Sequence, residues 1–277
     1  MAAGAAPCPQ PPEPLAPGPP MQASGRRIGV ALGSGSTHGL AHIGVIEELE
    51  ARGVPVSVVA GTSVGAVVGA LWASGSTGAE IENLSREGDW EKGEQFSPGW
   101  QALYSNQGLR TQMQKLLPRP IESWPRRFGA VATELATGKR RVLSRGDGAN
   151  AVLASTAMPV VFPPVMVDGH ALVDGALVEP VPSRAARELG ADFVIAVDVA
   201  YRPYEEPARG LVQSAFQAMH VLVNSLASEQ ARHADFVLRL DLHQTFMECA
   251  PVSMVYAGRL AVRERWSELS AALARPR

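Results

Sequence analysis

Short apolar runs rich in β-branched residues alternate along the chain with longer segments whose apolar residues recur at helical spacing. The first pattern fits buried strands and the second fits amphipathic helices. The predicted strands are residues 28–32, 56–60, 128–133, 193–199 and 236–240. The predicted helices are residues 40–52, 64–74, a helix opened by a capping box at Thr77 and Glu80, and residues 109–117, 149–157, 183–189, 210–233 and 255–273. This alternation predicts an α/β protein with a mainly parallel sheet covered by helices.

Two hairpins interrupt the alternation. Thr137-Gly138-Lys139 predicts a turn that returns the chain through residues 141–143. Asp168-Gly169 predicts a tight hairpin between residues 165–167 and 172–173, because Asp-Gly pairs favour the turn types that hairpins use. Residues 158–164 contain three prolines, so they are expected to be extended rather than helical.

The stretch from Val58 to Ala70 contains a candidate nucleophile. A β-branched run leads into Gly61-Thr62-Ser63-Val64-Gly65, and small apolar residues suited to a packed helix follow. This order predicts the strand-turn-helix nucleophile elbow, in which a strained backbone exposes the Ser63 hydroxyl above the sheet. A side chain at Gly61 or Gly65 would collide with the neighbouring strand and helix.

Two groups of residues are candidates for the base that acyl transfer requires. Asp174 lies in an apolar run, where a buried carboxylate can take the Ser63 proton directly in a Ser-Asp dyad. The alternative is a Ser-His-Asp triad completed by His220, His233 or His243. None of these histidines lies in a loop after a strand, so a packed or solvated role fits them better.

The segment 33–39 is glycine-rich and lies between a predicted strand and a predicted helix. It is expected to be a flexible loop that opens at the same sheet edge as Ser63. The N–H groups of Gly35 and Ser36 are candidate oxyanion donors. A phosphate-binding loop is the rival interpretation, but the chain has neither a P-loop nor a dinucleotide-binding motif here.

Composition narrows the functional classes. The chain has 277 residues, 46% of them hydrophobic, and a formal net charge of −2, which gives no general attraction to nucleic acid. Two cysteines, Cys8 and Cys249, predict neither a disulfide framework nor a zinc site. Residues 1–25 are rich in proline and alanine and resemble no secretory signal, so they are expected to be a disordered tail before a single domain at 26–277. With no apolar run long enough to span a membrane, a cytoplasmic location with at most peripheral membrane contact is expected.

The region from Trp90 to Trp124 has a looser pattern. Trp90, Phe96, Trp100, Tyr104 and Trp124 stand among Gly, Pro and polar residues. These aromatic residues belong either to a lid or membrane-facing acyl entrance, or to the ordinary core of a helical excursion.

Taken together, these segments resemble the patatin-like phospholipase family. The segment 31–45 is similar to its glycine-rich oxyanion loop and helix, Gly61–Gly65 to its nucleophile motif, and Asp174-Gly175-Ala176 to its Asp-Gly-Ala/Gly motif. Residues 131–138 and 155–165 resemble intervening segments of small bacterial members. The resemblance implies a three-layer α/β/α fold, a Ser63/Asp174 dyad, hydrolysis of lipid or small acyl esters, and neither metal nor cofactor. The motif glycines that it implies are Gly33, Gly39, Gly61, Gly65 and Gly175.

The oxyanion loop departs from the family pattern at two positions. Family members usually have Arg or Lys where this chain has His38, and glycine is commonest at the position of Ser36. The resemblance places Gly35, Ser36 and His38 at the oxyanion hole, where a neutral His38 would contribute less than a cation. We therefore expect a serine acyl hydrolase, and the alternative is a weakly active or non-catalytic regulatory protein on the same fold. Oligomeric state does not follow from the sequence.

Overall fold

The computed structural model describes residues 25–87, 95–96, 104–118, 120–199, 210–240 and 251–275. Several predictions concern residues outside these ranges: the tail at 1–24, Trp90, Trp100, both cysteines and His243. No helix in the described part of the chain is long and apolar enough to cross a membrane.

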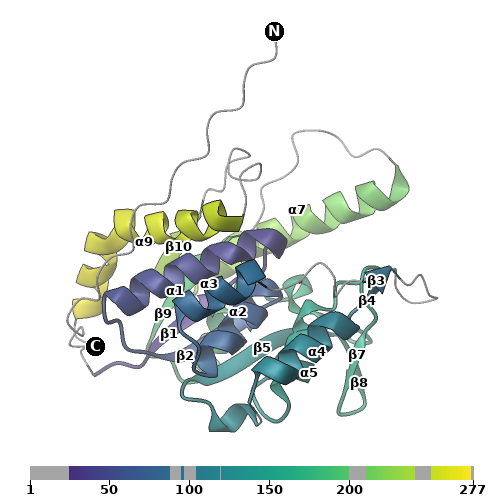
Figure 1. The fold of residues 1–277 in the computed structure, drawn as a ribbon. Coiled ribbons are helices and arrows are strands. Elements are labelled where there is room, and N and C mark those ends of the chain that lie inside the picture. Colours follow the sequence, from purple (N-terminus) through teal and green to yellow (C-terminus); the bar gives the residue numbers. More distant parts are fainter. Residues whose placement is uncertain are drawn as a thin grey trace.

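The predicted elements appear at the predicted places, most within one or two residues (Figure 1). The strands are β1 Ile28–Leu32, β2 Val56–Thr62, β3 Gln95–Phe96, β4 Tyr104–Ser105, β5 Arg127–Glu134, β6 Arg140–Leu143, β7 Val165–Val167, β8 His170–Asp174, β9 Phe193–Asp198 and β10 Phe236–Arg239. The α-helices are α1 Ala41–Ala51, α2 Val64–Ala73, α3 Gly78–Glu87, α4 Gln107–Leu116, α5 Gly148–Thr156, α6 Ser183–Glu188, α7 Leu211–Ala231 and α9 Pro251–Ala274. Short 3₁₀ turns are η1 Ser36–Leu40, η3 Ile121–Ser123 and η4 Gly175–Leu177.

The central sheet has the order β10-β9-β1-β2-β5-β8-β7, with β6 also paired to β5. The strands from β10 to β5 are parallel, and β6, β7 and β8 add an antiparallel edge. Both hairpins are present. Asp168 and Gly169 have φ of 48° and 80°, and positive φ at both central residues is what a type I′ turn requires.

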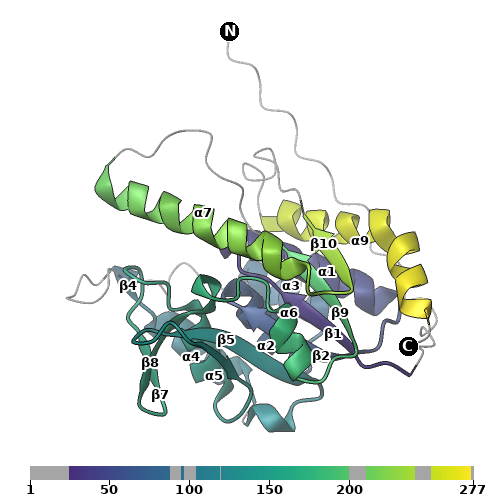
Figure 2. The ribbon, with the colours of Figure 1, turned by 180° about the vertical axis from the view of Figure 1, so that it is seen from behind.

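Helices cover both faces of this sheet, which confirms the predicted three-layer α/β/α fold. Alternate residues of each strand point to opposite faces. In β1, Ile28, Val30 and Leu32 pack in the large cluster with α1, α2 and α9. Ala31 packs on the other face against Ala185 of α6. Figure 1 is seen from the side of α1, α2 and α3, and Figure 2 from the side of α6 and α7.

Helix α7 packs against the sheet only at its C-terminal end, among the side chains described there. Ala227 and Ala231 pack with Ala196 of β9, and Gln230 Nε2 donates to the Val178 carbonyl at 2.7 Å. Both views show the N-terminal half of α7 reaching away from the sheet. The side of the molecule beyond the strand ends is therefore bounded by a helix that is anchored at its C-terminal end.

Strands β2 and β8 meet end to end on the same side of β5. Thr62, the last residue of β2, pairs with Val131, and Asp174, the last residue of β8, pairs with the next residue of β5, Ala132. Strand β6 occupies the other side of β5 at both positions. Because β8 runs antiparallel to β5, the two strands approach with their C-terminal ends facing, which brings Asp174 beside Ser63.

Candidate active site

Ser63 occupies a strained turn between β2 and α2. Its φ of 56° and ψ of −126° are unfavourable for a residue with a side chain, as expected at a nucleophile elbow. A Cβ on Gly65 would lie 2.1 Å from the Leu32 carbonyl oxygen, and one on Gly61 would lie 2.4 Å from that of Gly65. Only glycine at these positions lets the turn pack this closely.

Ser155 holds the backbone of the elbow. The Ser63 N–H donates to Ser155 Oγ at 2.9 Å, and Ser155 Oγ donates to the Val131 carbonyl at 2.6 Å. The Ser155 side chain is fully buried on α5. No sequence pattern identified Ser155 as a site residue. The sequence feature that could have indicated this role is a serine within residues 149–157, a segment otherwise rich in small and apolar side chains.

Asp174 accepts a hydrogen bond from Ser63 Oγ at Oδ2, at 2.7 Å. Its other carboxylate oxygen, Oδ1, accepts from the Ala176 N–H at 2.8 Å. Burial raises the pKa of Asp174 from 3.8 to about 6, although the hydrogen bonds from Ala176 and Ser63 act in the opposite direction. A Cβ on Gly175 would lie 2.2 Å from the Val131 carbonyl oxygen, so glycine allows the chain to turn directly after the carboxylate.

Of the late histidines, His220 and His233 lie within the described residues and neither completes a triad with this pair, while His243 lies outside the described ranges. The Ser63 hydroxyl donates straight to Asp174, so no imidazole stands between the two side chains. His233 lies just after α7, where its Nε2 is 3.1 Å from an Arg184 nitrogen. His220 does reach the cavity above Ser63, which its position within a long helix did not predict. In the described part of the chain, Ser63 is thus hydrogen-bonded directly to Asp174, with no histidine between them.

The glycine-rich segment is fixed at its start and helical at its end. The Gly33 N–H donates to the Val197 carbonyl at 3.0 Å, and the Ser34 N–H donates to the Pro180 carbonyl at 2.8 Å. Where the sequence predicted a flexible loop, residues Ser36–Leu40 form the 3₁₀ turn η1. A Cβ on Gly39 would lie 2.3 Å from the Val64 side chain, so this turn packs closely on the start of α2.

The loop presents two backbone donors near Ser63. Within the described ranges, the N–H groups of Gly35 and Ser36 have no protein acceptor. Ser36 has a φ of 51°, in the left-handed region that favours glycine. Glycine, which is usual at this position in the family, adopts this conformation without strain, whereas Ser36 adopts it with backbone strain.

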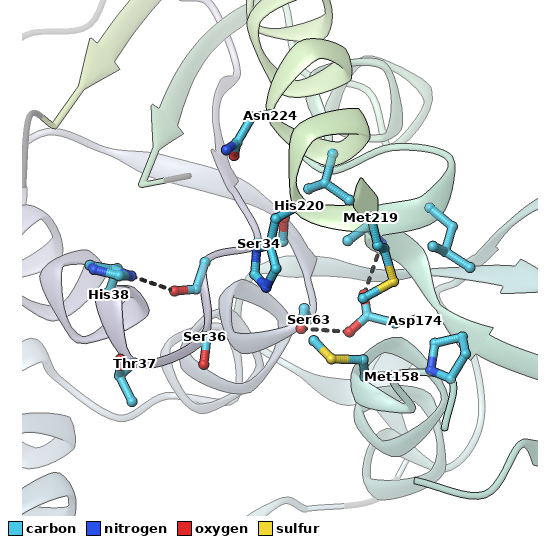
Figure 3. A pocket seen from close by; sticks show the side chains of 15 residues that line it. Ser34, Ser36, Thr37, His38, Ser63, Met158, Asp174, Met219, His220 and Asn224 are labelled. Carbon is cyan, nitrogen blue, oxygen red and sulfur yellow. Dashed lines mark hydrogen bonds between the residues drawn. The ribbon is translucent and has the colours of Figure 1, made fainter. Parts of the chain in front are cut away.

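His38 supports the loop from within. Its side chain is buried, and its Nδ1–H donates to the Gly35 carbonyl at 3.0 Å. Burial lowers the pKa of His38, so the ring is neutral at pH 7. Figure 3 shows this ring on the far side of the Gly35 carbonyl from Ser63. His38 therefore places no positive charge where family members carry Arg or Lys.

His42 is a second buried histidine below the loop. Its Nε2–H donates to the Gly33 carbonyl at 2.8 Å, and its Nδ1 has no partner among the described residues. Burial lowers the pKa of His42 to about 4. The ring is thus a neutral hydrogen-bond donor that fixes the first peptide of the glycine-rich segment. No sequence pattern predicted this role for His42.

A cavity of about 300 Å³ opens over Ser63 and Asp174 (Figure 3). The loop residues Gly35 and Ser36 line one side of it. The apolar part of its wall consists of Met158, Pro159, Ala176, Leu177, Met219 and Val223. In the part of the chain that the structure covers, no three His, Cys, Asp or Glu side chains gather closely enough to hold a metal ion.

The predicted lid region is described only in part. Trp124 is 7% exposed and packs against Phe128, with 5.2 Å between ring centroids. This residue belongs to the core, as the second of the two interpretations held. Residues 88–94 and 97–103 lie outside the described ranges, and the Phe96 side chain is not described.

Comparison with known proteins finds one family whose model matches more than half of the chain. The model for patatin-like phospholipase matches residues 30–187. This range includes the elbow, the glycine-rich segment and Asp174.

Curated relatives share this stretch. An NTE family protein of Mycobacterium tuberculosis is 36% identical over 186 residues, which is 64% of this chain and 50% of that protein. Human patatin-like phospholipase domain-containing protein 6 is 31% identical over 187 residues, 64% of this chain and 14% of that protein. The matched stretch thus spans half the length of the mycobacterial relative and a much smaller share of the human one.

Among solved structures, VipD from Legionella pneumophila has a similar fold. The TM-score is 0.57 at 14% sequence identity, covering 88% of this chain and 67% of VipD. At this identity the likeness concerns the fold alone.

Proposed function

The chain belongs to the patatin-like phospholipase family, and from this membership we propose that it is a serine acyl hydrolase that cleaves carboxylic esters of lipids with a Ser63/Asp174 dyad. The observation that carries the proposal is the 2.7 Å hydrogen bond from Ser63 Oγ to Asp174 Oδ2, made by a serine at the strained turn between β2 and α2. A serine at a strained backbone turn, facing the cavity and in contact with a base, is the arrangement expected of a nucleophile.

Asp174 acts as the base in this mechanism. Its raised pKa, about 6, makes the carboxylate a stronger base than an exposed one while leaving it ionised at pH 7. The Ala176 N–H holds Oδ1, so Oδ2 is the oxygen that faces the Ser63 hydroxyl. As Ser63 Oγ bonds to the ester carbonyl carbon, its proton moves to Asp174. The same proton then passes to the departing alcohol.

The glycine-rich segment stabilises the negative charge that develops on the carbonyl oxygen. The backbone N–H groups of Gly35 and Ser36 are its proposed donors, since no protein acceptor among the described residues uses them. Donors held by a rigid backbone stabilise a developing oxyanion without reorganising. After the alcohol leaves, a water molecule deprotonated by Asp174 attacks the acyl-enzyme at the same place and frees Ser63.

The acyl group of the substrate fits the apolar wall of the cavity. Met158, Leu177, Met219 and Val223 face this space, whose volume is at the small end of the range for ligand pockets. We propose that it takes one acyl chain of a lipid ester and that the alcohol part lies toward solvent.

Labelling with a fluorophosphonate tests the proposal. Wild type, Ser63→Ala and Asp174→Asn are compared for covalent labelling and for p-nitrophenyl ester turnover. We expect labelling of wild type alone and a fall in kcat of about 10³-fold or more in each variant, as for other serine hydrolases that lose nucleophile or base. A folded wild type that neither labels nor turns over ester would refute the proposal and favour the regulatory alternative.

A further inference from the structure

The cavity contains one titratable side chain that the proposed mechanism leaves without a role. Of the described residues that line it, His38, Asp174 and His220 can titrate. Asp174 bonds to Ser63, and His38 bonds to the Gly35 carbonyl. His220 comes from α7, on the side of the cavity opposite the sheet.

The position of His220 relates it to the oxyanion loop. Figure 3 shows its ring descending from α7 into the cavity, beside Ser34 and above Ser63. Its charge would lower the pKa of His38, which belongs to the loop turn η1. The pKa of Asp174, in contrast, is set by burial, Ala176 and Ser63. His220 thus lies on the loop side of the reaction centre, away from the carboxylate.

The chemistry of the ring suits that position. Burial lowers the pKa of His220, so the imidazole is neutral at pH 7. A neutral imidazole has one N–H donor and one acceptor nitrogen. Side-chain donors often complete an oxyanion hole that backbone N–H groups begin. Such a donor is useful here, because His38 is turned toward the Gly35 carbonyl.

We propose that His220 is a further catalytic residue, whose ring N–H donates to the oxyanion formed when Ser63 attacks the ester. The inference rests on the proposed function. As the Ser63–carbon bond forms, the carbonyl electron pair moves onto oxygen and the serine proton moves to Asp174. His220 keeps its proton throughout and gives only a hydrogen bond. Collapse of the oxyanion breaks the bond to the alcohol, which takes the proton from Asp174.

Two substitutions separate this role from a structural one. His220→Phe keeps a planar ring and removes the donor, whereas His220→Gln keeps an N–H donor. Leu222→Ala, at a 71% exposed position on the same helix, is the matched control. We expect His220→Phe to lower kcat by about 10²-fold with little change in KM, as for loss of one oxyanion donor. His220→Gln should retain most of the activity, and the control should equal wild type.

Inhibition by a trifluoromethyl ketone distinguishes an oxyanion donor from a residue with a purely structural role. The ketone's adduct with Ser63 carries an oxyanion, so its Ki should rise in His220→Phe by about the factor by which kcat falls. An equal kcat and Ki in wild type and His220→Phe would overturn the inference. Because Asp174, with a pKa of about 6, is the proposed base, wild-type kcat/KM should fall as pH drops through about 6, and His220→Phe should keep this dependence. Loss of the dependence in His220→Phe would also overturn the inference, because His220 would then be the base. If wild type shows no Ser63-dependent labelling or turnover, the proposed function itself fails, a different result from either of these.

Discussion

The two walls of the cavity are held in different ways. On the sheet side, Ser63 and Asp174 are fixed by hydrogen bonds from Ser155 and Ala176 and by strand ends that meet on β5. On the opposite side, Met219 and His220 are half-buried on α7, whose buried residues are Ala227, Gln230 and Ala231 at its C-terminal end, among the side chains described there. The comparison indicates that the nucleophile and its base depend on a rigid frame, while the apolar contacts that α7 offers to the substrate tolerate change.

The largest effect is expected where the frame is tightest, at Gly65. Gly65→Ala places a Cβ 2.1 Å from the Leu32 carbonyl oxygen, a backbone atom that cannot move aside. We expect the free energy of unfolding to fall by more than about 3 kcal/mol, the upper end of common overpacking penalties. Denaturant unfolding measures this loss of stability, and fluorophosphonate labelling measures whether Ser63 still reacts.

Gly69 offers the control on the same helix. A Cβ there would contact the side chains of Val59 at 3.0 Å and Leu32 at 3.3 Å, which can adjust. Since alanine is favoured over glycine inside a helix by about 1 kcal/mol, Gly69→Ala should be close to neutral. Equal destabilisation by both substitutions would show that the elbow is no tighter than the rest of α2.

The elbow could be predicted because its signal is local. Gly61, Ser63 and Gly65 lie within five consecutive residues, and the strand before and the helix after them are visible in the apolar pattern. The Asp-Gly turn likewise predicted the hairpin of β7 and β8. What no local pattern gives is that β8 ends beside β2, which depends on how both pair with β5.

The supporting residues could not be predicted for the same reason. Ser155 lies 92 residues from Ser63, and only the packing of α5 on the sheet brings it to the elbow. Helical spacing placed His220 on a helix but could not tell which face would meet the cavity. The glycine-rich segment was expected to be flexible because glycine is permissive, yet tertiary hydrogen bonds at Gly33 and Ser34 fix it.

The second prediction concerns the buried carboxylate of Asp174 and its effect on stability. Asp174 has a folded-state pKa of about 6, above its usual 3.8, so folding favours the protonated form. Its contribution to stability is fully present below pH 3.8 and is lost as pH rises through about 6. The wild type therefore becomes less stable relative to Asp174→Asn over this window, by about 3 kcal/mol at pH 8 from the pKa difference.

The measurement is the difference in unfolding free energy between wild type and Asp174→Asn from pH 4 to pH 8. Other carboxylates titrate alike in both proteins, so the difference isolates this group. Wild-type kcat/KM should fall as pH drops through about 6, because the carboxylate that accepts the Ser63 proton becomes protonated. His38 and His220 also line the cavity, but burial lowers their pKa values, so both rings are neutral at pH 7 and above. A stability difference that does not vary with pH would contradict the assignment.

The smallest effect is expected at Met219, an apolar residue of the α7 wall. Met219 lies half-buried at the cavity, where its side chain can contact an acyl chain. Met219→Ala removes roughly one to two methylenes of contact area, each worth about 0.8 kcal/mol when fully buried. We expect KM for p-nitrophenyl octanoate to rise by less than about tenfold, with p-nitrophenyl acetate and kcat almost unchanged. Leu222→Ala, on the exposed face of the same helix, should leave both esters unaffected. A parallel loss of kcat for acetate and octanoate would mean that α7 also positions Ser63 and Asp174, and the distinction between the two walls would then fail.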